Sequence, residues 1–464
     1  MKVLELINNG ILAYNEYVGG VALLLLLIPV GIYFTFRLKF LQITRIKHTF
    51  RIIAGKYDNL GDKGDVSHFK ALTTALSATV GTGNIVGVSL AIYYGGPGAV
   101  FWMWVTAFFG LMLKFAENTL SLKYRIFNRD GSVSGGPMYY IEALKPKIGK
   151  TAKVLAVIFA IAAVTCSLGT GNMAQSNSIA DAMNQSYNVP TWVTAIVISM
   201  LVLLIVVGGL KRIADVTSKL VPIMAVFYFI AAITILGIYI TDVPGAIKLI
   251  VTDAFTGRAA GGGFMGSMFL FTMLKGVQRG LFSNEAGQGS SPMAHAAAKT
   301  EYPVREGLVA SIEPLVDTLI ICSLTALVIV VTGAWQSGIE GVGMTIAGFQ
   351  TGLGQIGLEG LAQHIITFGL LLFAFSTIIS WSYYGTRAVQ YLLGEKMIKP
   401  YYYFFAFFVM LGAVGRIDIV WNFVDMVITF MTIPNLIALI LLAPVLSKEV
   451  RDYFNMMKKK NFKN

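Results

Sequence analysis

Residues 69–93 read FKALTTALSATVGTGNIVGVSLAIY, an apolar stretch long enough to cross a lipid bilayer, with Gly81, Thr82, Gly83 and Asn84 at its middle. A membrane-spanning helix must satisfy its backbone N–H and C=O groups within itself, because the hydrocarbon contains no water. Each glycine weakens such a helix by about 1 kcal/mol relative to alanine. The stretch therefore predicts a helix that is broken at mid-membrane, where it lines a protected cavity and presents free backbone groups to a charged solute.

The composition of the whole chain indicates a polytopic membrane protein. Of its 464 residues, 56% are hydrophobic and 13% are charged, and the mean hydropathy is +0.70, whereas soluble proteins carry about 25% charged residues. The net charge of +12 does not indicate a nucleic-acid surface, because the basic residues lie in alternate loops, as orientation signals do. Cys166 and Cys322 lie inside apolar segments, so we expect them to pack rather than to form a disulfide or bind a metal.

Apolar runs of bilayer-spanning length number eleven in this sequence, since about twenty residues cross the hydrocarbon. Loops rich in lysine and arginine, such as 37–66 and 123–153, alternate with loops that contain neither, such as 94–97 and 181–190. Cytoplasmic loops carry the excess of these residues, so the pattern predicts a cell-membrane protein with its N-terminus outside and its C-terminus in the cytoplasm. The expected spans are 18–36, 68–93, 98–122, 154–180, 191–209, 217–240, 264–284, 306–332, 362–386, 401–415 and 419–446.

Ten of these spans divide into two consecutive halves of five, which have opposite orientations in the membrane. The first half opens with the break at Gly81, and the second opens with Gly261–Gly263, after which Gly276 and Gly280 are expected to interrupt the span. Interrupted segments at corresponding positions of two halves indicate a transporter site. The predicted fold is an all-α polytopic membrane protein with an extra N-terminal helix and an inverted-repeat core whose first and sixth helices are broken. The expected divisions are 1–66 (N-terminal helix and cytoplasmic loop), 67–240 (first repeat), 241–447 (second repeat) and 448–464 (basic cytoplasmic tail).

Several longer motifs stand out, namely ATVGTGNIVGVSLAI, GGPGAVFWMW, GGPMYYIE, GLFSNEAGQGSSPMAHAAA and ISWSYYGTRAVQYL. Together they resemble the alanine or glycine:cation symporter family, from about residue 65 to about residue 440. That resemblance implies a fold similar to the bacterial leucine transporter. It also implies symport of small neutral amino acids, alanine or glycine, into the cell by alternating access, with Na⁺ as the coupling ion. A proton-coupled transporter of the same fold and an ion channel remain alternatives.

The other expected partners follow from the same reading. The basic tail is expected to lie against anionic lipid headgroups of the bilayer. The four histidines show no zinc-ligand spacing, and no phosphate loop or nucleophile motif is present, so we expect a transporter without a cofactor rather than an enzyme.

A small amino acid is a zwitterion, and a broken helix offers a partner to each of its charges. Free N–H groups at the start of the half-helix near Thr82 suit a carboxylate, so the backbone of Thr82 and Gly83 is expected to hold it. Carbonyls that end the preceding half, around Ser77 to Val80, face a cation or an ammonium group. The alternative is that Gly83 and Gly87 form a small-residue packing face between helices.

Polar side chains near the two expected breaks are the other candidates for the substrate site. Asn84 either donates to the carboxylate or caps the second half-helix. Asn172 and Gln175 lie in an unusually polar run of a span, and their carbonyl oxygens either accept from the ammonium group or bond between helices. Phe271 and Thr272, beside the second expected interruption, are candidates for the pocket wall.

Hydroxyl groups in the stretch FAFSTIISWSYYG indicate a sodium site. Ser376 and Thr377 would face the carbonyl groups of Ser77 and Val80, and such a cage of oxygen atoms suits a small hard cation. The resemblance implies such a site between the first and eighth core helices. Hydrogen bonds from these hydroxyls to their own helix are the alternative, and Trp381 either walls the pocket or packs as an ordinary aromatic side chain.

Charged side chains inside spans are functional candidates by default. Lys114 and Glu117 are spaced i, i+3, so they are expected to neutralise one another on one helix face. Glu313 and Asp317 are spaced i, i+4 and need a cation or a proton between them, for which Lys275 is the expected partner.

Overall fold

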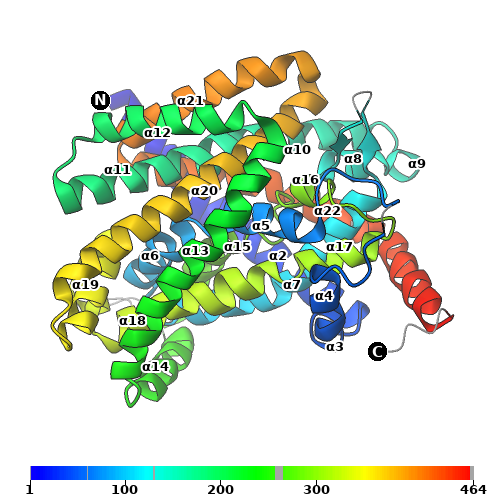
Figure 1. Ribbon diagram of the computed structural model, residues 1–464. Helices are drawn as coiled ribbons and strands as arrows, with labels where there is room; N and C mark the ends of the chain where they lie inside the picture. Colours follow the sequence, from blue (N-terminus) through cyan, green and yellow to red (C-terminus); the bar gives the residue numbers. More distant parts are fainter. Residues whose placement is uncertain (1, 60, 129–130, 257–264, 460–464) are drawn as a thin grey trace.

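The computed structural model describes residues 2–59, 61–128, 131–256 and 265–459, and nearly all of them are helical (Figure 1). The only sheet among them is a short antiparallel hairpin of β1 (Ile126–Phe127) and β2 (Val133–Ser134). Within this part of the chain, eight helical segments are long and apolar enough to span a membrane, as expected for the all-α class. They are Glu5–Arg37, Ala99–Lys123, Thr151–Tyr187, Gly209–Ile238, Pro303–Val331, Glu359–Leu393, Glu395–Val414 and Ile419–Lys459.

The three other expected spans are also helical, so the structure is consistent with the predicted count of eleven. One is α12 (Thr191–Val206), which is apolar but shorter than the rest. Another is α15 (Met265–Asn284), which carries Lys275 and Arg279. The third is the broken segment around Gly81.

The first expected break is confirmed. Helix α5 (His68–Thr79) ends before the break, the short helix η2 (Thr82–Asn84) lies within it, and α6 (Val86–Gly95) follows. Residues 71–92 are buried throughout. A broken backbone at such depth is tolerated only where protein surrounds it, and that is the arrangement observed.

The second break occurs later in the chain than the sequence predicts. Helix α15 runs without interruption through Gly276 and Gly280, so the expected break within 264–284 is wrong, and Gly261–Gly263 lie outside the described residues. These glycines allow close packing on α7 (Ala99–Lys123), because a β-carbon on Gly276 would lie 2.3 Å from the Ala99 carbonyl oxygen. The interruption instead spans 285–291, before the short helix α16 (Pro292–His295).

Two wide helical turns provide further irregular backbone within spans. Turn η3 (Gly169–Met173) separates α10 (Thr151–Leu168) from α11 (Ala174–Tyr187), and turn η4 (Leu315–Cys322) separates α17 (Pro303–Ala310) from α18 (Ser323–Val331). Such π-helical turns are frequent at functional sites. Asp317 of η4 contacts Asn84 of η2 directly, whereas η3 is linked to η2 through Gln175, which accepts from the Thr82 N–H and donates to the Thr170 carbonyl oxygen.

The remaining elements complete the bundle. Exposed large apolar side chains occur along α12, α13 and α21, as on a lipid-facing surface. These elements are α1 (Lys2–Tyr14), η1 (Asn15–Gly19), α2 (Gly20–Arg37), α3 (Leu41–Thr44), α4 (Ile46–Ile53), α8 (Pro137–Glu142), α9 (Lys145–Ile148), α13 (Gly209–Ile238), α14 (Val243–Thr256), η5 (Ala334–Gln336), α19 (Val342–Gly354), α20 (Glu359–Leu393), η6 (Glu395–Met397), α21 (Ile398–Val414) and α22 (Ile417–Lys459).

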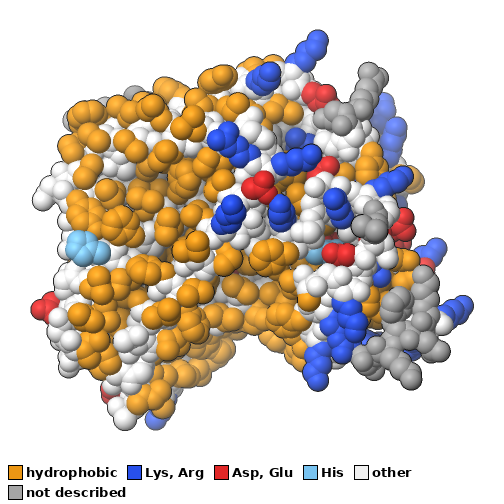
Figure 2. Space-filling view, in the orientation of Figure 1, with side chains coloured by type: hydrophobic (Ala, Val, Ile, Leu, Met, Phe, Trp, Pro, Cys, Tyr) orange, Lys and Arg blue, Asp and Glu red, His pale blue; other side chains and the backbone are white. Residues whose placement is uncertain are grey.

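Charge is distributed unevenly over the surface. Figure 2 shows lysine and arginine side chains gathered on one side of the molecule, over the region of α4, α8, α9 and the C-terminal end of α22. We call this side the basic end. Helices α14, α18 and α19 lie on the opposite side of the molecule (Figure 1).

Candidate functional site

The first break is held open by amide side chains rather than by helical hydrogen bonds. The Gly81 N–H donates to Asn84 Oδ1 at 2.9 Å, and the Thr82 N–H donates to Gln175 Oε1 at 3.0 Å. Asn84 therefore closes the start of the short helix η2, whereas α6, the second half-helix, begins without a side-chain cap. Thr82 Oγ1 is buried and has no hydrogen-bond partner among the described residues, so the break retains a free polar group.

Gly81 lies where three separate spans meet. A β-carbon on this residue would be 2.5 Å from Thr377 Oγ1 and 2.9 Å from Gln175 Oε1. Thr377 belongs to α20 and Gln175 to α11. The glycine is thus required by the close approach of two polar side chains to the broken backbone.

The structure brings three of the four proposed sodium ligands together, namely Ser77, Ser376 and Thr377. Thr377 Oγ1 lies 2.8 Å and Ser376 Oγ 3.4 Å from the Ser77 carbonyl oxygen. Both hydroxyls also lie near the Phe373 carbonyl oxygen, at 3.1 and 2.8 Å. Val80 follows the end of α5 directly, with its N–H on the Leu76 carbonyl oxygen. The Ser376 and Thr377 hydroxyls therefore converge with the carbonyl oxygens of Ser77 and Phe373 between α5 and α20, and neutral oxygen donors of this kind suit a hard monovalent cation.

Trp381 connects η3 to the second break. Its ring packs on the backbone of η3, where a β-carbon on Gly171 would lie 2.0 Å from Trp381 Cγ. Its indole N–H donates to Glu285 Oε1 at 2.8 Å, and Glu285 is the first residue of the second break. The side chain is completely buried.

Asn172 is placed differently from Gln175. Its Nδ2 donates to the Phe405 carbonyl oxygen of α21 at 2.8 Å, which is an interhelical bond. Its Oδ1 is buried and accepts no hydrogen bond from the described residues. The two expected roles of Asn172 therefore do not exclude each other. Its Nδ2 bonds between helices, and its free Oδ1 is available to an ammonium group.

Phe271 and Thr272 do not border a helix break, so the expectation that placed them beside the second interruption is wrong. Thr272 Oγ1 donates to the carbonyl oxygen of Gly95, the last residue of α6. The Phe271 ring lies 5.1 Å from Lys275 Nζ. The glycines that suggested a break serve helix packing instead, and these two side chains follow the regular surface of α15.

Asp317 lies at the first break, although the sequence predicted that its partner would be Lys275. Its carboxylate accepts from Asn84 Nδ2 at 2.8 Å and from Ser283 Oγ at 2.7 Å. Lys275, its expected partner, lies instead over the rings of Tyr94 and Phe271. Ser283 is adjacent to the first break as well, because a β-carbon on Gly83 would be 3.0 Å from its Cα. Asp317 thus contacts the end of η2 at Asn84, whereas Gln175 contacts its start at Thr82.

The expected pairing of Lys114 with Glu117 is also wrong. Lys114 Nζ lies 2.8 Å from Glu313 Oε2, whereas Glu117 Oε1 accepts from Asn435 Nδ2 at 2.6 Å. Spacing along one helix identifies only local partners, and here a neighbouring helix supplies a closer one.

Comparisons with known proteins show which family the chain resembles. The chain matches the sodium:alanine symporter family over residues 4–464. It is 40% identical over 468 residues to the sodium/alanine symporter AgcS of Methanococcus maripaludis, with 100% of each chain covered. It is 37% identical over 436 residues to the amino-acid carrier protein AlsT of Bacillus subtilis, with 93% of this chain and 89% of that one covered.

A solved structure shares the fold. The structure of MhsT in complex with L-phenylalanine matches with a TM-score of 0.59 at 14% sequence identity, covering 82% of this chain and 90% of that one. The predicted fold class and family are thereby confirmed, and the chain is a transporter rather than an enzyme.

Proposed function

Because this chain belongs to the sodium:alanine symporter family, we propose that it carries a small neutral amino acid, alanine or glycine, into the cell together with Na⁺. The coarser statement, cation-coupled symport of an amino acid by a multi-pass membrane protein, follows from the family itself. The finer proposal is carried by one observation, the convergence of Ser376 and Thr377 hydroxyls on the Ser77 carbonyl beside the broken backbone.

The sodium ion would occupy the oxygen cluster between α5 and α20. Its charge would replace the hydrogen bonds that Ser376 and Thr377 now donate to the Ser77 carbonyl, and would hold the end of α5 against α20. Since this end adjoins Gly81, the bound ion would order the broken segment before the amino acid arrives. Binding of one ligand then favours binding of the other, which is positive coupling.

The amino acid would bind across the break. Its carboxylate would accept from the N–H groups of Thr82 and Gly83 at the start of the second half-helix. Gln175 Oε1 already accepts from the Thr82 N–H, so it occupies the position of a carboxylate oxygen and must move when substrate binds. The ammonium group would face the free Oδ1 of Asn172 and the carbonyl end of α5.

Coupling to sodium would draw on the membrane potential. We propose that the basic end faces the cytoplasm, with the N-terminus outside, because cytoplasmic loops carry the excess of lysine and arginine. An inward-negative potential then contributes about 2.3 kcal/mol per charge per 100 mV to sodium entry. Alternating exposure of one site to the two sides would convert that energy into amino-acid accumulation.

Uptake by purified protein in liposomes tests the proposal. We expect saturable uptake of alanine or glycine that requires an inward sodium gradient, with serine weaker and leucine excluded. Equal uptake driven by a proton gradient in sodium-free medium would contradict the choice of ion. Ion current without saturation by an amino acid would indicate a channel.

Thr377→Ala tests the sodium site directly. We expect about a tenfold rise in the sodium concentration for half-maximal uptake, because one of four oxygen ligands is lost, a change of about 1.4 kcal/mol. Thr386→Ala on the same helix is the matched control, since Thr386 is also buried and donates only to its own helix, at the Tyr383 carbonyl. An unchanged sodium requirement in Thr377→Ala would remove this residue from the site.

A further inference from the structure

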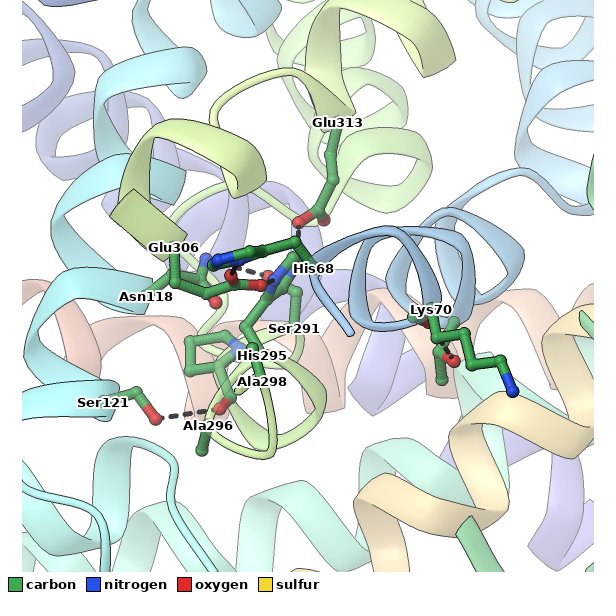
Figure 3. A network of polar contacts seen from close by, with 12 residues as sticks. His68, Lys70, Asn118, Ser121, Ser291, His295, Ala296, Ala298, Glu306 and Glu313 are labelled. Carbon is green, nitrogen blue, oxygen red and sulfur yellow. Dashed lines mark hydrogen bonds and ion pairs between the residues drawn. The ribbon is translucent and has the colours of Figure 1, made fainter. Parts of the chain in front are cut away.

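A chain of ionisable side chains crosses the buried interior between the first break and the basic end. In order of contact it contains His68 of α5, Glu306 of α17, His295 of α16, Glu313 after α17 and Lys114 of α7. All five side chains are at least 98% buried. We call this set the histidine–glutamate chain, and Figure 3 shows its two histidines and two glutamates in contact. Neither the proposed sodium site nor the proposed amino-acid site uses it.

The geometry of His295 requires an additional proton. Its Nδ1 lies 2.5 Å from Glu306 Oε1, and its Nε2 lies 2.7 Å from Glu313 Oε1. A neutral imidazole has one donor and one acceptor nitrogen, whereas an ionised carboxylate can only accept. Both contacts are hydrogen bonds only if the ring is an imidazolium or one carboxyl group is protonated. In either form the group holds one proton more than a neutral histidine between two carboxylates.

The surrounding charges favour retention of that proton. Four buried carboxyl groups lie around His295. Two are its direct partners, Glu306 and Glu313, and the others are Glu117 from α7 and Glu285 from the second break. Lys114 is the fixed cation within the chain, and Arg125 and Arg305 approach from its basic-end side, where Arg305 donates to the Tyr57 carbonyl. From α20 the nearest groups are the neutral Trp381 and Tyr384. An unbalanced buried negative charge is costly, so a proton stabilises the chain.

A path for that proton leads to the basic end. His68 Nδ1 contacts Glu306, and its Nε2 lies 3.8 Å from Asp58 Oδ1. The Asp58 side chain is 47% exposed, so it can exchange protons with water. The other residues between it and His295 are in hydrogen-bond contact with one another, which permits transfer along the chain.

The elements that the chain connects are those that close the first break toward the basic end. Helix α5 runs from His68, next to the half-exposed Asp58, to Thr79 at the first break, so separation of α5 from its neighbours would open the break on that side. His68, its first residue, is held by Glu306 of α17, and His295 of α16 is held by the same carboxyl group. The proton at His295 therefore ties α16 to the same carboxyl group of α17 that His68 of α5 contacts.

We propose that His295, between Glu306 and Glu313, forms a proton-binding site open to the cytoplasm, and that the bound proton holds α5 against α16 and α17. Loss of the proton at alkaline pH leaves a neutral His295 between two ionised carboxylates, so α16 no longer holds the Glu306 carboxyl group to which His68 of α5 is also bonded, and α5 is released. The assignment of the side as cytoplasmic rests on the proposed function. The site itself does not depend on which solute is carried.

Labelling of a cysteine on α5 tests this site in detergent, without amino acid or sodium. Thr74→Cys places a thiol on the buried face of α5, where Thr74 now contacts Thr217 of α13. The rate of reaction with a hydrophilic maleimide, divided by that of free glutathione at the same pH, measures opening of α5. Background labelling is measured on the chain without Thr74→Cys, whose Cys166 and Cys322 are buried, and is subtracted.

The normalised rate is expected to rise with pH from about 6.5 to about 9.5, by up to about tenfold per pH unit once the proton leaves. Glu306→Gln in the same background is expected to abolish that rise. A glutamine donates to Nδ1 of a neutral His295, whose Nε2 then donates to Glu313, so no additional proton is needed. His295→Gln is expected to give the same flat profile, which keeps the test available if one variant fails to fold.

His48→Gln is the matched control. His48 lies at the same end of the molecule and contacts the Tyr453 hydroxyl at 2.8 Å. Burial, together with Arg305, Arg45 and Arg51, lowers the pKa of His48 to about 4, so this histidine stays neutral over the tested range. The control should retain the pH-dependent rise. A flat profile in the parent Thr74→Cys chain, or an undiminished rise in both Glu306→Gln and His295→Gln, would overturn the proposal, whereas failure of sodium-driven uptake would leave it unaffected.

Discussion

Two buried polar regions lie next to each other in this bundle, and they are built from different kinds of groups. The first break is surrounded mainly by neutral amides and hydroxyls, such as Gln175 and Thr377, with Asp317 on one side. The histidine–glutamate chain consists entirely of ionisable groups in mutual contact. Among the described residues, Thr82 Oγ1 and Asn172 Oδ1 of the first region have no hydrogen-bond partner, and in the histidine–glutamate chain the same holds for His68 Nε2.

Because of this difference, substitutions in the two regions should have different effects on ligand binding and on stability. A neutral hydrogen bond contributes about 1 kcal/mol net, so a ligand can replace it without disrupting the fold. Removing one partner of a buried ion pair costs about 3–5 kcal/mol, because the other charge stays buried and unpaired. Substitutions at the break should therefore affect transport more than stability, and substitutions in the chain should do the reverse.

Gly81→Ala should have the largest effect on transport. The added methyl group would lie 2.5 Å from Thr377 Oγ1 and 2.9 Å from Gln175 Oε1, so it must displace the side chains proposed for both ligands. We expect uptake to fall by about 100-fold or more, equivalent to about 2.7 kcal/mol, with little change in the melting temperature of the purified protein.

Gly87→Ala is the control, because its added methyl group would meet its nearest atom, Phe282 Cδ1, at 3.7 Å, an ordinary contact distance. Uptake close to that of the parent chain is expected. Normal uptake by Gly81→Ala would show that the break tolerates side-chain volume and does not bind the solute.

Lys114→Met should have the largest effect on stability. It leaves Glu313 buried beside His295 without its lysine partner, and we expect a loss of about 3–5 kcal/mol in the free energy of unfolding. Chemical denaturation in detergent measures it. Lys70→Met removes an exposed pair with Asp215 and should cost far less, because exposed ion pairs contribute little to stability. Equal losses in the two variants would contradict the contrast between the regions.

The first break was predictable because its cause is local. Two glycines, a threonine and an asparagine in sequence oppose helix formation regardless of what surrounds them. The oxygen cluster was predictable for a related reason. Ser376 and Thr377 are consecutive in the sequence, and the family resemblance implied that their helix faces the first core helix. The structure then brings them to the Ser77 carbonyl.

The errors arose where tertiary contacts decide. Gly276 and Gly280 have the composition of a helix break, yet α15 remains regular because α7 packs closely against these positions. Lys114 has Glu117 within one turn, yet it pairs with Glu313 from another helix. Neither outcome can be read from spacing along one segment, because each depends on which helix is adjacent.

Asn172→Ala should give the smallest measurable change in amino-acid affinity, and it distinguishes a substrate-binding role of Asn172 from a packing role. Its Nδ2 bond to the Phe405 carbonyl contributes to packing, whereas its free Oδ1 is available to the substrate. If both atoms matter, amino-acid affinity should weaken about fivefold, near 1 kcal/mol, and stability should fall by a similar amount. Isothermal titration calorimetry with alanine in the presence of sodium measures the change in affinity, and a melting curve measures the change in stability. Asn177→Ala is the control, because Asn177 donates to the Gly412 and Gly415 carbonyls at the end of α21 and should alter stability alone. Unchanged affinity in Asn172→Ala would leave this side chain with a packing role, and Gln175 would then be the amide that contacts the solute.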